Sequence, residues 1–506
     1  MVELLPDRIR GHGSRLAIVD PGGEHVYADL DATAHRLAAR LLGERDDLDG
    51  DRVALLCRPG RDFVVGLLGG WLAGALVVPL HPDHPVAELE YSVRDAGVTT
   101  VVASESMRPL VSRLAATVPE LVVLGVSDVD ESTEDGRRAG LPALEPDRPA
   151  LMVYTSGTTG RPKGAVHSHG SIAAQIAGMV ELWRWSSEDR VLLVLPLHHV
   201  HGIVNVTLCA LWQGATCEAP GGFDATEVWE RLASGAITLF MAVPTIYARL
   251  TKAWDDADGT TRQRWSSRAA HLRLMVCGSA ALPVVVLDRW ESITGHRLLE
   301  RYGMTELGMV LSNSLEHRVP GHVGFPMPGA AIRVVDDQGH DVASGEAGEL
   351  LVRGPQVFLG YWDRPEATAE TFVDGWFRTG DVAVETPEGF RLLGRASVDI
   401  LKTGGEKVSA LEIEEAFRRH PAVADCAVVG IPDDEWGQRV GIAIVPAGAP
   451  GPDPVELRAW GKEQLAAAKV PTRWLVLDEL PRNAMGKVTK PALIDRFHLD
   501  GGPTTR

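Results

Sequence analysis

Cysteine is scarce in this chain. Only five occur in 506 residues, they are widely spaced, and no two have the CxxC spacing of a zinc or redox site. This distribution argues against a zinc site and a disulfide framework, and it favours a reducing cytoplasm. We expect the five thiols to be small buried apolar groups.

Positive charge is also in short supply. The chain has 50 Lys and Arg residues against 68 Asp and Glu residues, so its formal net charge is −18. Such a protein repels nucleic acid and anionic membranes, and we expect neither as a partner. Phosphate ligands remain compatible with this charge, because a local group of cations and backbone N–H groups can override the overall sign.

No signal peptide is predicted, because residues 1–7 contain acidic groups and no apolar core segment. One apolar run, Phe63–Leu80, approaches the length of a membrane span. It contains several glycines and ends in Val-Val-Pro-Leu, so we predict a buried helix followed by a buried strand. The expected location is therefore the cytoplasm, without a membrane partner.

The chain is too long for one compact domain. Through the first four hundred or so residues, strand-like apolar runs alternate with helical stretches, which is typical of α/β layers with mainly parallel strands. The predicted strands include Arg52–Leu56, Thr100–Ala103, Leu121–Leu124, Val191–Leu195 and Leu272–Cys277, and the predicted helices include Thr33–Leu42 and Ala225–Leu232.

The pattern changes twice further along. Residues 321–394 hold short alternating runs broken by Gly, Pro and Asp, which predict a small antiparallel sheet or barrel. After Gly394-Arg395 the sequence is typical of a compact α+β unit, with a helix at Leu411–His420 and another at Glu456–Ala468. We predict an N-terminal domain of layered sheets, flanking helices and a barrel-like subdomain (1–395), and a small C-terminal domain (396–506).

The strongest local signal is the run Tyr154-Thr-Ser-Gly-Thr-Thr-Gly-Arg-Pro-Lys-Gly164. It can present N–H groups and hydroxyls to a polyphosphate, with Lys163 adding positive charge. The spacing differs from that of a Walker A loop. A flexible surface loop is the alternative, but the apolar strand Ala150–Tyr154 directly before the run favours a ligand loop.

Further motifs follow in a fixed order. They are Arg301-Tyr-Gly-Met-Thr-Glu306, Trp376-Phe-Arg-Thr-Gly-Asp381, Gly394-Arg395, Lys402-Thr-Gly-Gly-Glu-Lys407 and Asn483-Ala-Met-Gly-Lys487. With these motifs, the chain resembles the adenylate-forming superfamily of acyl-CoA synthetases, peptide-synthetase adenylation domains and firefly luciferase.

This resemblance implies an ATP site. Tyr302 can stack on the purine, and Asp381 can accept the ribose hydroxyls with support from Arg395. The expected nucleotide-binding residues are Thr155, Ser156, Gly157, Thr158, Thr159, Gly160, Gly278, Ser279, Ala280, Glu300, Tyr302, Gly303, Met304, Asp381 and Arg395.

The same resemblance implies the catalytic residues. The expected set is Lys487, Thr305, Glu306 and Lys163. Thr305 can donate to an α-phosphate, and Glu306 is a hard oxygen ligand suited to Mg²⁺. Lys487 would bridge the substrate carboxylate and the α-phosphate and neutralise charge in the transition state. No covalent nucleophile is needed, because the substrate carboxylate attacks the phosphorus itself.

Four residues are expected around the acyl group: His199, His201, Arg301 and Ser279. A guanidinium beside the pocket favours a second carboxylate on the substrate. The alternative is that Arg301 forms a structural ion pair with Glu300 or another acid. The segments around Arg301 and Ser397 are similar to those of malonyl-CoA synthetases, whose substrates are malonate and often methylmalonate.

The resemblance also implies coenzyme A as the second substrate and a mobile C-terminal domain. The residues expected along the pantetheine path are Lys402, Gly404, Gly405 and Lys407. Ser397 stands where the superfamily often has an Asp or Lys hinge, and the loop after it is one residue longer than in several relatives. Ala468 stands where an aromatic residue is common.

Two other functions compete with a dicarboxylate–CoA ligase. One is a ligase for a monocarboxylic acid. The other is a stand-alone adenylation module that loads a carrier protein in trans. A carrier protein is not the expected partner, since no Gly-Gly-x-Ser carrier motif follows Lys487. The sequence does not discriminate against luciferase-like chemistry, which begins with the same half-reaction.

Overall fold

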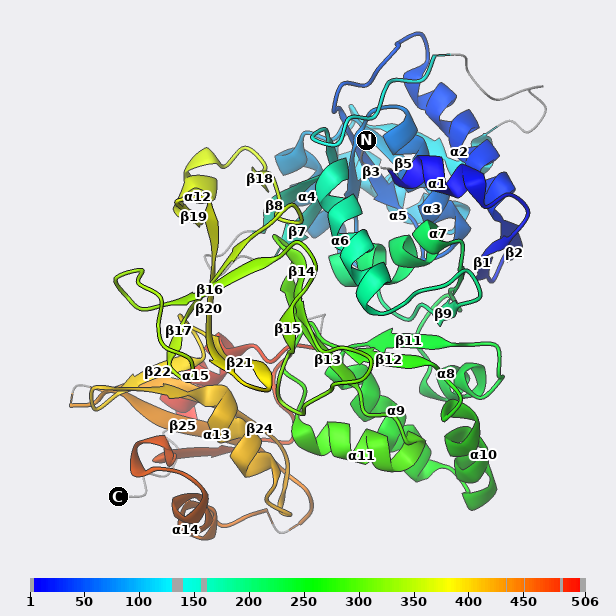
Figure 1. The fold of residues 1–506 in the computed structure, drawn as a ribbon. Coiled ribbons are helices and arrows are strands. Elements are labelled where there is room, and N and C mark those ends of the chain that lie inside the picture. The colour runs from blue at the N-terminus through cyan, green and yellow to red at the C-terminus, as the bar shows by residue number, and fades with distance from the viewer. Residues whose placement is uncertain are drawn as a thin grey trace.

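The computed structural model describes residues 4–129, 140–155, 162–433, 435–449, 451–482 and 486–500. In these residues the strands form four sheets (Figure 1). Two large sheets with helices on their faces make up the first part of the chain. A smaller antiparallel sheet follows, and the last sheet lies next to it.

The largest sheet is mainly parallel, with antiparallel strands at its two ends. Its strands in spatial order are β15 (Phe325–Pro326), β14 (Gly308–Ser312), β13 (Leu299–Met304), β12 (Leu274–Cys277), β11 (Leu239–Ala242), β9 (Arg190–Leu192), β10 (Thr216–Glu218), β1 (Leu16–Asp20) and β2 (Gly23–Val26).

The second sheet has a parallel run from β7 to β6 and antiparallel strands β8 and β18 at one side. Its order is β18 (Gly360–Tyr361), β8 (Lys163–Ser168), β7 (Pro149–Thr155), β4 (Leu76–Pro79), β3 (Arg52–Leu56), β5 (Thr100–Ala103) and β6 (Val122–Gly125).

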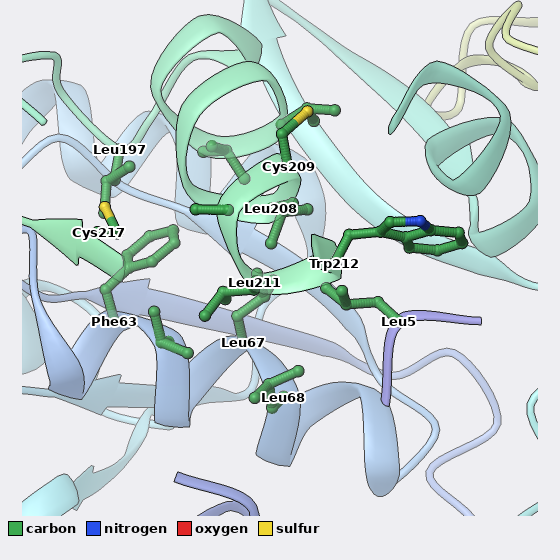
Figure 2. Close-up of a cluster of buried hydrophobic side chains, with 14 of the residues drawn as sticks. Leu5, Phe63, Leu67, Leu68, Leu197, Leu208, Cys209, Leu211, Trp212 and Cys217 are labelled. Carbon is green, nitrogen blue, oxygen red and sulfur yellow. The ribbon is translucent and has the colours of Figure 1, made fainter. Parts of the chain in front are cut away.

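The helices of this first part are α1 (Leu5–Gly11), α2 (Tyr27–Leu42), α3 (Arg61–Leu72), α4 (Val86–Ala96), α5 (Arg108–Thr117), α6 (His169–Leu182), the π-helix η3 (His201–Leu208), α7 (Cys209–Gln213), α8 (Ala225–Leu232), α9 (Pro244–Asp256), α10 (Gly259–Ala269) and α11 (Val284–Thr294). A core cluster joins α3, η3 and α7, and Figure 2 shows Phe63 and Leu67 of α3 facing Leu208 and Leu211. Burial of such side chains stabilises the fold by roughly 1.5–3 kcal/mol each.

The third sheet is antiparallel and contains β16 (Ala331–Val335), β17 (Ala347–Arg353), β20 (Trp376–Thr386), β19 (Phe372–Val373) and β21 (Gly389–Arg395), with α12 (Pro365–Glu370) beside it. The fourth contains β23 (Glu406–Ser409), β22 (Ile400–Thr403), β25 (Gly437–Pro446), β24 (Val423–Asp433) and β26 (Arg473–Val476), with α13 (Ala410–Arg418), α14 (Pro454–Gln464) and α15 (Lys490–Asp500). This last unit has cores of its own, which is what a separate domain requires.

The layered α/β architecture with a small C-terminal unit agrees with the prediction. Phe63–Leu80 forms a helix and then a strand, α3 and β4, and both are buried. Among the described helices, none combines the length and the apolar character needed to span a bilayer. All five cysteines are buried and free.

Several predicted boundaries are wrong. The helix predicted to begin at Thr33 begins at Tyr27, and the strand predicted to begin at Leu272 begins at Leu274. The strand predicted to end at Leu195 ends at Leu192, although the N–H of Leu193 still donates to the carbonyl of Glu218 at 2.7 Å. The helix predicted to reach Ala468 ends at Gln464, where Leu465 takes an extended conformation. The domain division predicted after residue 395 falls between β21 and β22, in the turn of residues 396–399.

Candidate active site

A cleft of about 1930 Å³ lies where the largest sheet, the antiparallel sheet and the C-terminal unit meet. The strands β13, β20 and β21 bring to it residues that are far apart in the sequence. The predicted site residues that line it are Thr155, Lys163, His199, His201, Gly278, Ser279, Ala280, Glu300, Arg301, Tyr302, Gly303, Met304, Thr305, Glu306, Asp381, Arg395 and Lys487.

Five predicted phosphate-loop residues, Ser156, Gly157, Thr158, Thr159 and Gly160, lie outside the described residues, as do Asn483, Ala484 and Met485 of the last motif. The flanks of the phosphate loop are described. Thr155 ends β7 and pairs in register with Lys163, the first residue of β8. The antiparallel pair therefore returns both ends of the loop to the same side of the cleft.

Tyr302, Asp381 and Arg395 form one hydrogen-bonded group. The Tyr302 hydroxyl donates to Oδ2 of Asp381 at 2.5 Å, and Arg395 Nε lies 3.0 Å from Oδ1. Arg395 also donates from Nη1 to the carbonyl of Thr379 at 2.7 Å. Burial raises the pKa of Asp381, and the nearby Arg395 opposes that rise. The contacts fix the ring of Tyr302 and hold a carboxylate beside it.

The turn after β13 carries Thr305 and Glu306. The buried Glu306 carboxylate accepts a hydrogen bond from the Tyr361 hydroxyl at 2.8 Å. Lys163 Nζ lies 5.1 Å from the centre of the same tyrosine ring. Burial raises the pKa of Glu306. Among the described side chains no cation forms an ion pair with Glu306, so none of them competes with a ligand for this carboxylate.

Arg301 also lines the cleft. It is 5% exposed, and its Nε and Nη2 atoms are buried without a hydrogen-bond partner. Burial lowers the pKa of Arg301 to about 10, which leaves the group charged at neutral pH. A side chain at Gly278 would place Cβ 2.5 Å from the guanidinium carbon, so only glycine leaves room for this packing.

The predicted alternative, a structural ion pair of Arg301, is wrong for the described residues, since none of their carboxylates forms one with it. Glu300, its neighbour in sequence, instead accepts the N–H of Gly321 at 2.8 Å. Burial raises the pKa of Glu300 to about 8.

His201 and Ser279 meet beside Arg301. The Ser279 hydroxyl and His201 Nδ1 are 3.0 Å apart, while His201 Nε2 is buried and has no partner. Ser279 has a positive φ of 68°, an uncommon conformation for a residue with a side chain. Burial lowers the pKa of His201, with a further contribution from Arg301, and burial lowers that of His199 to about 4. Both imidazoles are therefore neutral hydrogen-bonding groups.

Lys487 reaches the cleft from the C-terminal unit. Its side chain remains accessible to solvent, yet desolvation within the cleft lowers its pKa, as does the positive charge of Arg395. Asp381 opposes that shift. The neighbouring Gly486 packs against Thr245 at the start of α9, since a Cβ at Gly486 would lie 3.0 Å from the threonine hydroxyl. This fit draws the lysine toward the large domain.

Lys402, Gly404, Gly405 and Lys407 do not line the cleft. They lie on the hairpin formed by β22 and β23. The Lys407 ammonium contacts Oδ2 of Asp337 at 2.8 Å, on the turn after β16. Gly404 and Gly405 have positive φ angles of 58° and 86°, which suit glycine at a tight turn.

Sequence reasoning missed several residues around these groups. The buried His167 donates from Nε2 to the carbonyl of Thr305 at 2.6 Å, and Tyr361 holds Glu306. Neither residue stands in a motif that the sequence analysis singled out. The only available signal was the position of His167 on the strand that follows the phosphate loop.

The sequence matches the AMP-binding enzyme family over residues 5–362, and the C-terminal domain of AMP-binding enzymes over residues 412–487. It is 43% identical over 535 aligned positions to the mitochondrial malonate–CoA ligase ACSF3 of Mus musculus, covering 98% of this chain and 90% of that one.

Two solved structures of MatB from Rhodopseudomonas palustris are also similar. The ATP-bound crystal structure has a TM-score of 0.88, 34% identity and coverage of 98% of this chain and 99% of the other. The apo structure has the same identity and coverage and a TM-score of 0.81. The present arrangement of the chain is thus more like the ATP-bound form of that protein.

Proposed function

The chain belongs to the AMP-binding enzyme family, and we propose that it is a malonate–CoA ligase. The reaction would convert malonate, ATP and coenzyme A into malonyl-CoA, AMP and pyrophosphate through malonyl-adenylate. The observation that carries the dicarboxylate assignment is Arg301, a buried cation without an ion-pair partner among the described residues. The mouse relative named malonate–CoA ligase, at 43% identity, supports the same substrate.

The pocket around Arg301 is suited to a short diacid. A guanidinium can bind a carboxylate through two parallel hydrogen bonds. His201 adds an unpartnered Nε2 atom nearby, and its Nδ1 atom is occupied by Ser279. One carboxylate would bind to Arg301, and the other would point to the phosphate side of the cleft. We also propose methylmalonate as a second substrate, because the chain resembles malonyl-CoA synthetases, which often accept it.

The first half-reaction needs the substrate carboxylate in line with the α-phosphorus. We propose that Tyr302, Asp381 and Arg395 hold the adenosine, while the loop from Thr155 to Lys163 holds the phosphates. The carboxylate oxygen attacks phosphorus and the bond to pyrophosphate breaks. Thr305 and Lys487 would stabilise the charge that develops on the phosphate oxygens.

Glu306 fits a magnesium ion. It is a buried carboxylate at the phosphate side of the cleft, and hard oxygen ligands of this kind are what Mg²⁺ prefers. One such ligand is enough, because Mg²⁺ commonly takes its other ligands from phosphate and water. When bound, the ion would neutralise charge on the leaving pyrophosphate. The chain's own contribution is to hold Glu306 in place through Tyr361.

In the second half-reaction the thiol of coenzyme A attacks the acyl carbon, AMP leaves and the thiol proton is released. We propose that the domain of residues 396–506 rotates about the turn near Ser397 and brings Lys402, Gly404, Gly405 and Lys407 to the pantetheine path. The cytoplasm remains our predicted location, although the name of the mouse relative places that protein in mitochondria.

One experiment separates the candidate functions. Pyrophosphate exchange is measured with malonate, methylmalonate, acetate and a longer monocarboxylic acid, and coenzyme A consumption is measured in parallel. We expect exchange with malonate above all and one coenzyme A consumed per AMP formed. Preference for a monocarboxylic acid would overturn the dicarboxylate assignment. Adenylation without coenzyme A consumption would favour a module that loads a carrier protein.

A further inference from the structure

Lys490 is a buried cation that the proposed mechanism does not use. It is the first residue of α15, three positions after Lys487, and only 8% of it is exposed. Its ammonium group lies 2.5 Å from Oδ1 of Asp399 and 3.1 Å from Oε1 of Glu414. Burial alone would lower the pKa of Lys490, but the two carboxylates more than offset this and raise it.

Asp399 connects this ion pair to the turn between the two domains. Its second carboxylate oxygen, Oδ2, accepts the backbone N–H of Arg395 at 3.0 Å. The backbone N–H of Asp399 in turn donates to the carbonyl of Arg395 at 2.7 Å. Asp399 therefore bonds to both backbone groups of the residue whose side chain holds Asp381 in the cleft.

Glu414 anchors the group to the C-terminal unit. It lies on α13, is 4% exposed, and accepts the N–H of Val428 at 2.8 Å and Arg418 Nη2 at 3.2 Å. Two charged partners and a backbone donor satisfy this carboxylate. An ion-pair group so fully bonded has a single geometry, and loss of one member leaves an uncompensated buried charge.

We propose that Lys490 is a positioning residue for Lys487, which it holds at the α-phosphate side of the cleft by fastening the Lys487 segment to the turn after Arg395. This inference rests on the proposed function. The contacts form one path from Lys487 through Lys490, Asp399 and Arg395 to Asp381. Val488, the residue after Lys487, is held in addition by its bridge to Arg482. Through Asp399, the Lys490 ion pair connects this segment to the nucleotide-binding group.

The same contacts predict which of the two half-reactions depends on Lys490. The bond from the Arg395 N–H to Asp399 crosses the turn about which the domain would rotate. This bond can keep Lys487 in position near Asp381 only in the present arrangement of the two domains. Lys490 should therefore assist adenylate formation and have little influence on thioester formation.

The test compares the two half-reactions in Lys490→Met. Pyrophosphate exchange with malonate should lose roughly tenfold to a hundredfold in kcat, as expected for a displaced catalytic group, with a smaller change in KM for ATP. Conversion of supplied malonyl-adenylate to malonyl-CoA should stay within about twofold of wild type, which would exclude a general loss of folding. Lys490→Arg, which keeps the charge, should recover most of the exchange activity.

Two further variants keep the test decisive. Asp399→Asn removes the ion pair from the other side and should give the same selective loss, even if Lys490→Met fails to fold. Lys469→Met is the matched control, since Lys469 forms a half-exposed ion pair with Glu412 in the same unit and should change neither half-reaction.

Equal losses in both half-reactions, or unchanged exchange in a folded Lys490→Met protein, would overturn the role of Lys490. Should wild type exchange pyrophosphate with another acid and not with malonate, the proposed substrate fails. The same comparison run with that acid would still decide the role of Lys490.

Discussion

Lys487 and Lys407 belong to the same C-terminal unit, yet their surroundings differ. Lys487 lies in the cleft, where desolvation and Arg395 lower its pKa. Lys407 lies outside the cleft on an exposed hairpin and forms an ion pair with Asp337. The C-terminal unit thus presents one motif to the cleft and keeps the other outside it. On the proposed function, the described arrangement suits adenylate formation, and thioester formation would need a second arrangement that brings Lys407 to the cleft.

The largest expected effect is at Lys487. In Lys487→Ala, malonate-dependent pyrophosphate exchange should fall by roughly 10²- to 10³-fold, because a preorganised positive group is lost where charge develops. Supplied malonyl-adenylate should still be converted to malonyl-CoA at near the wild-type rate. If both half-reactions lose comparable activity, Lys487 does not serve adenylate formation alone, and one fixed active site becomes the better model.

Arg301→Ala should have the next largest effect, and it tests the acyl end of the cleft. Loss of a buried charged contact costs about 2–4 kcal/mol, which predicts a fall in kcat/KM for malonate of roughly 30- to 900-fold. The KM for ATP should change little, because Arg301 is not among the residues that hold Asp381. Wild-type kcat/KM for malonate in this variant would rule out the dicarboxylate assignment.

Glu306→Gln tests the metal end of the cleft. We expect the concentration of Mg²⁺ needed for half-maximal pyrophosphate exchange to rise by at least roughly 10- to 100-fold. A loss of that size is typical when a residue that only supports a metal ligand is removed. Burial raises the pKa of Glu306, so protons compete with Mg²⁺ for this carboxylate, and the Mg²⁺ affinity of the wild type should increase as pH rises through that pKa. The variant should lose that pH dependence, and full activity of wild type in excess chelator would contradict the metal assignment.

Much of this site was predictable because its residues stand in sequence motifs on or beside strands. Tyr302 lies near the end of β13, and Asp381 lies in the middle of β20, and a strand fixes the direction in which each of its side chains can point. The parallel sheets followed from apolar runs such as Arg52–Leu56, which are typical of strands buried on both faces.

What the sequence did not predict are contacts between residues that lie far apart along the chain. Nothing in the local pattern around Lys490 indicates that its partners are Asp399 and Glu414, 91 positions away in the case of Asp399. His167 is similar, since its bond to the carbonyl of Thr305 joins two different sheets. Such pairs depend on tertiary packing and carry no periodic signal.

A smaller effect is expected at the turn itself. Proline fixes φ and restricts the residue before it, so Ser397→Pro should hinder rotation of the C-terminal domain. Exchange should persist while thioester formation slows by about tenfold, a size typical of a step limited by domain motion. Ser397→Ala is the control and should behave as wild type. If Ser397→Pro is also indistinguishable from wild type, rotation occurs at another residue of the turn, such as Val398.

The smallest expected effect is at Asp337, but its direction tests most directly how the role of Lys407 differs from that of Lys487. Its ion pair with Lys407 is exposed, so removing it should change any rate by less than about fivefold.

The direction of the rate change in two variants tests the role of Lys407. Asp337→Asn releases Lys407 without altering it, so the second arrangement should become easier to reach and thioester formation from malonyl-adenylate should rise slightly. Lys407→Ala breaks the same contact but also removes a group proposed to line the pantetheine path, so thioester formation should fall. Stopped-flow measurement of both variants at low salt gives the two signs, and high salt should weaken the Asp337 effect by screening. If both variants change the rate in the same direction, Lys407 has no role beyond its contact with Asp337.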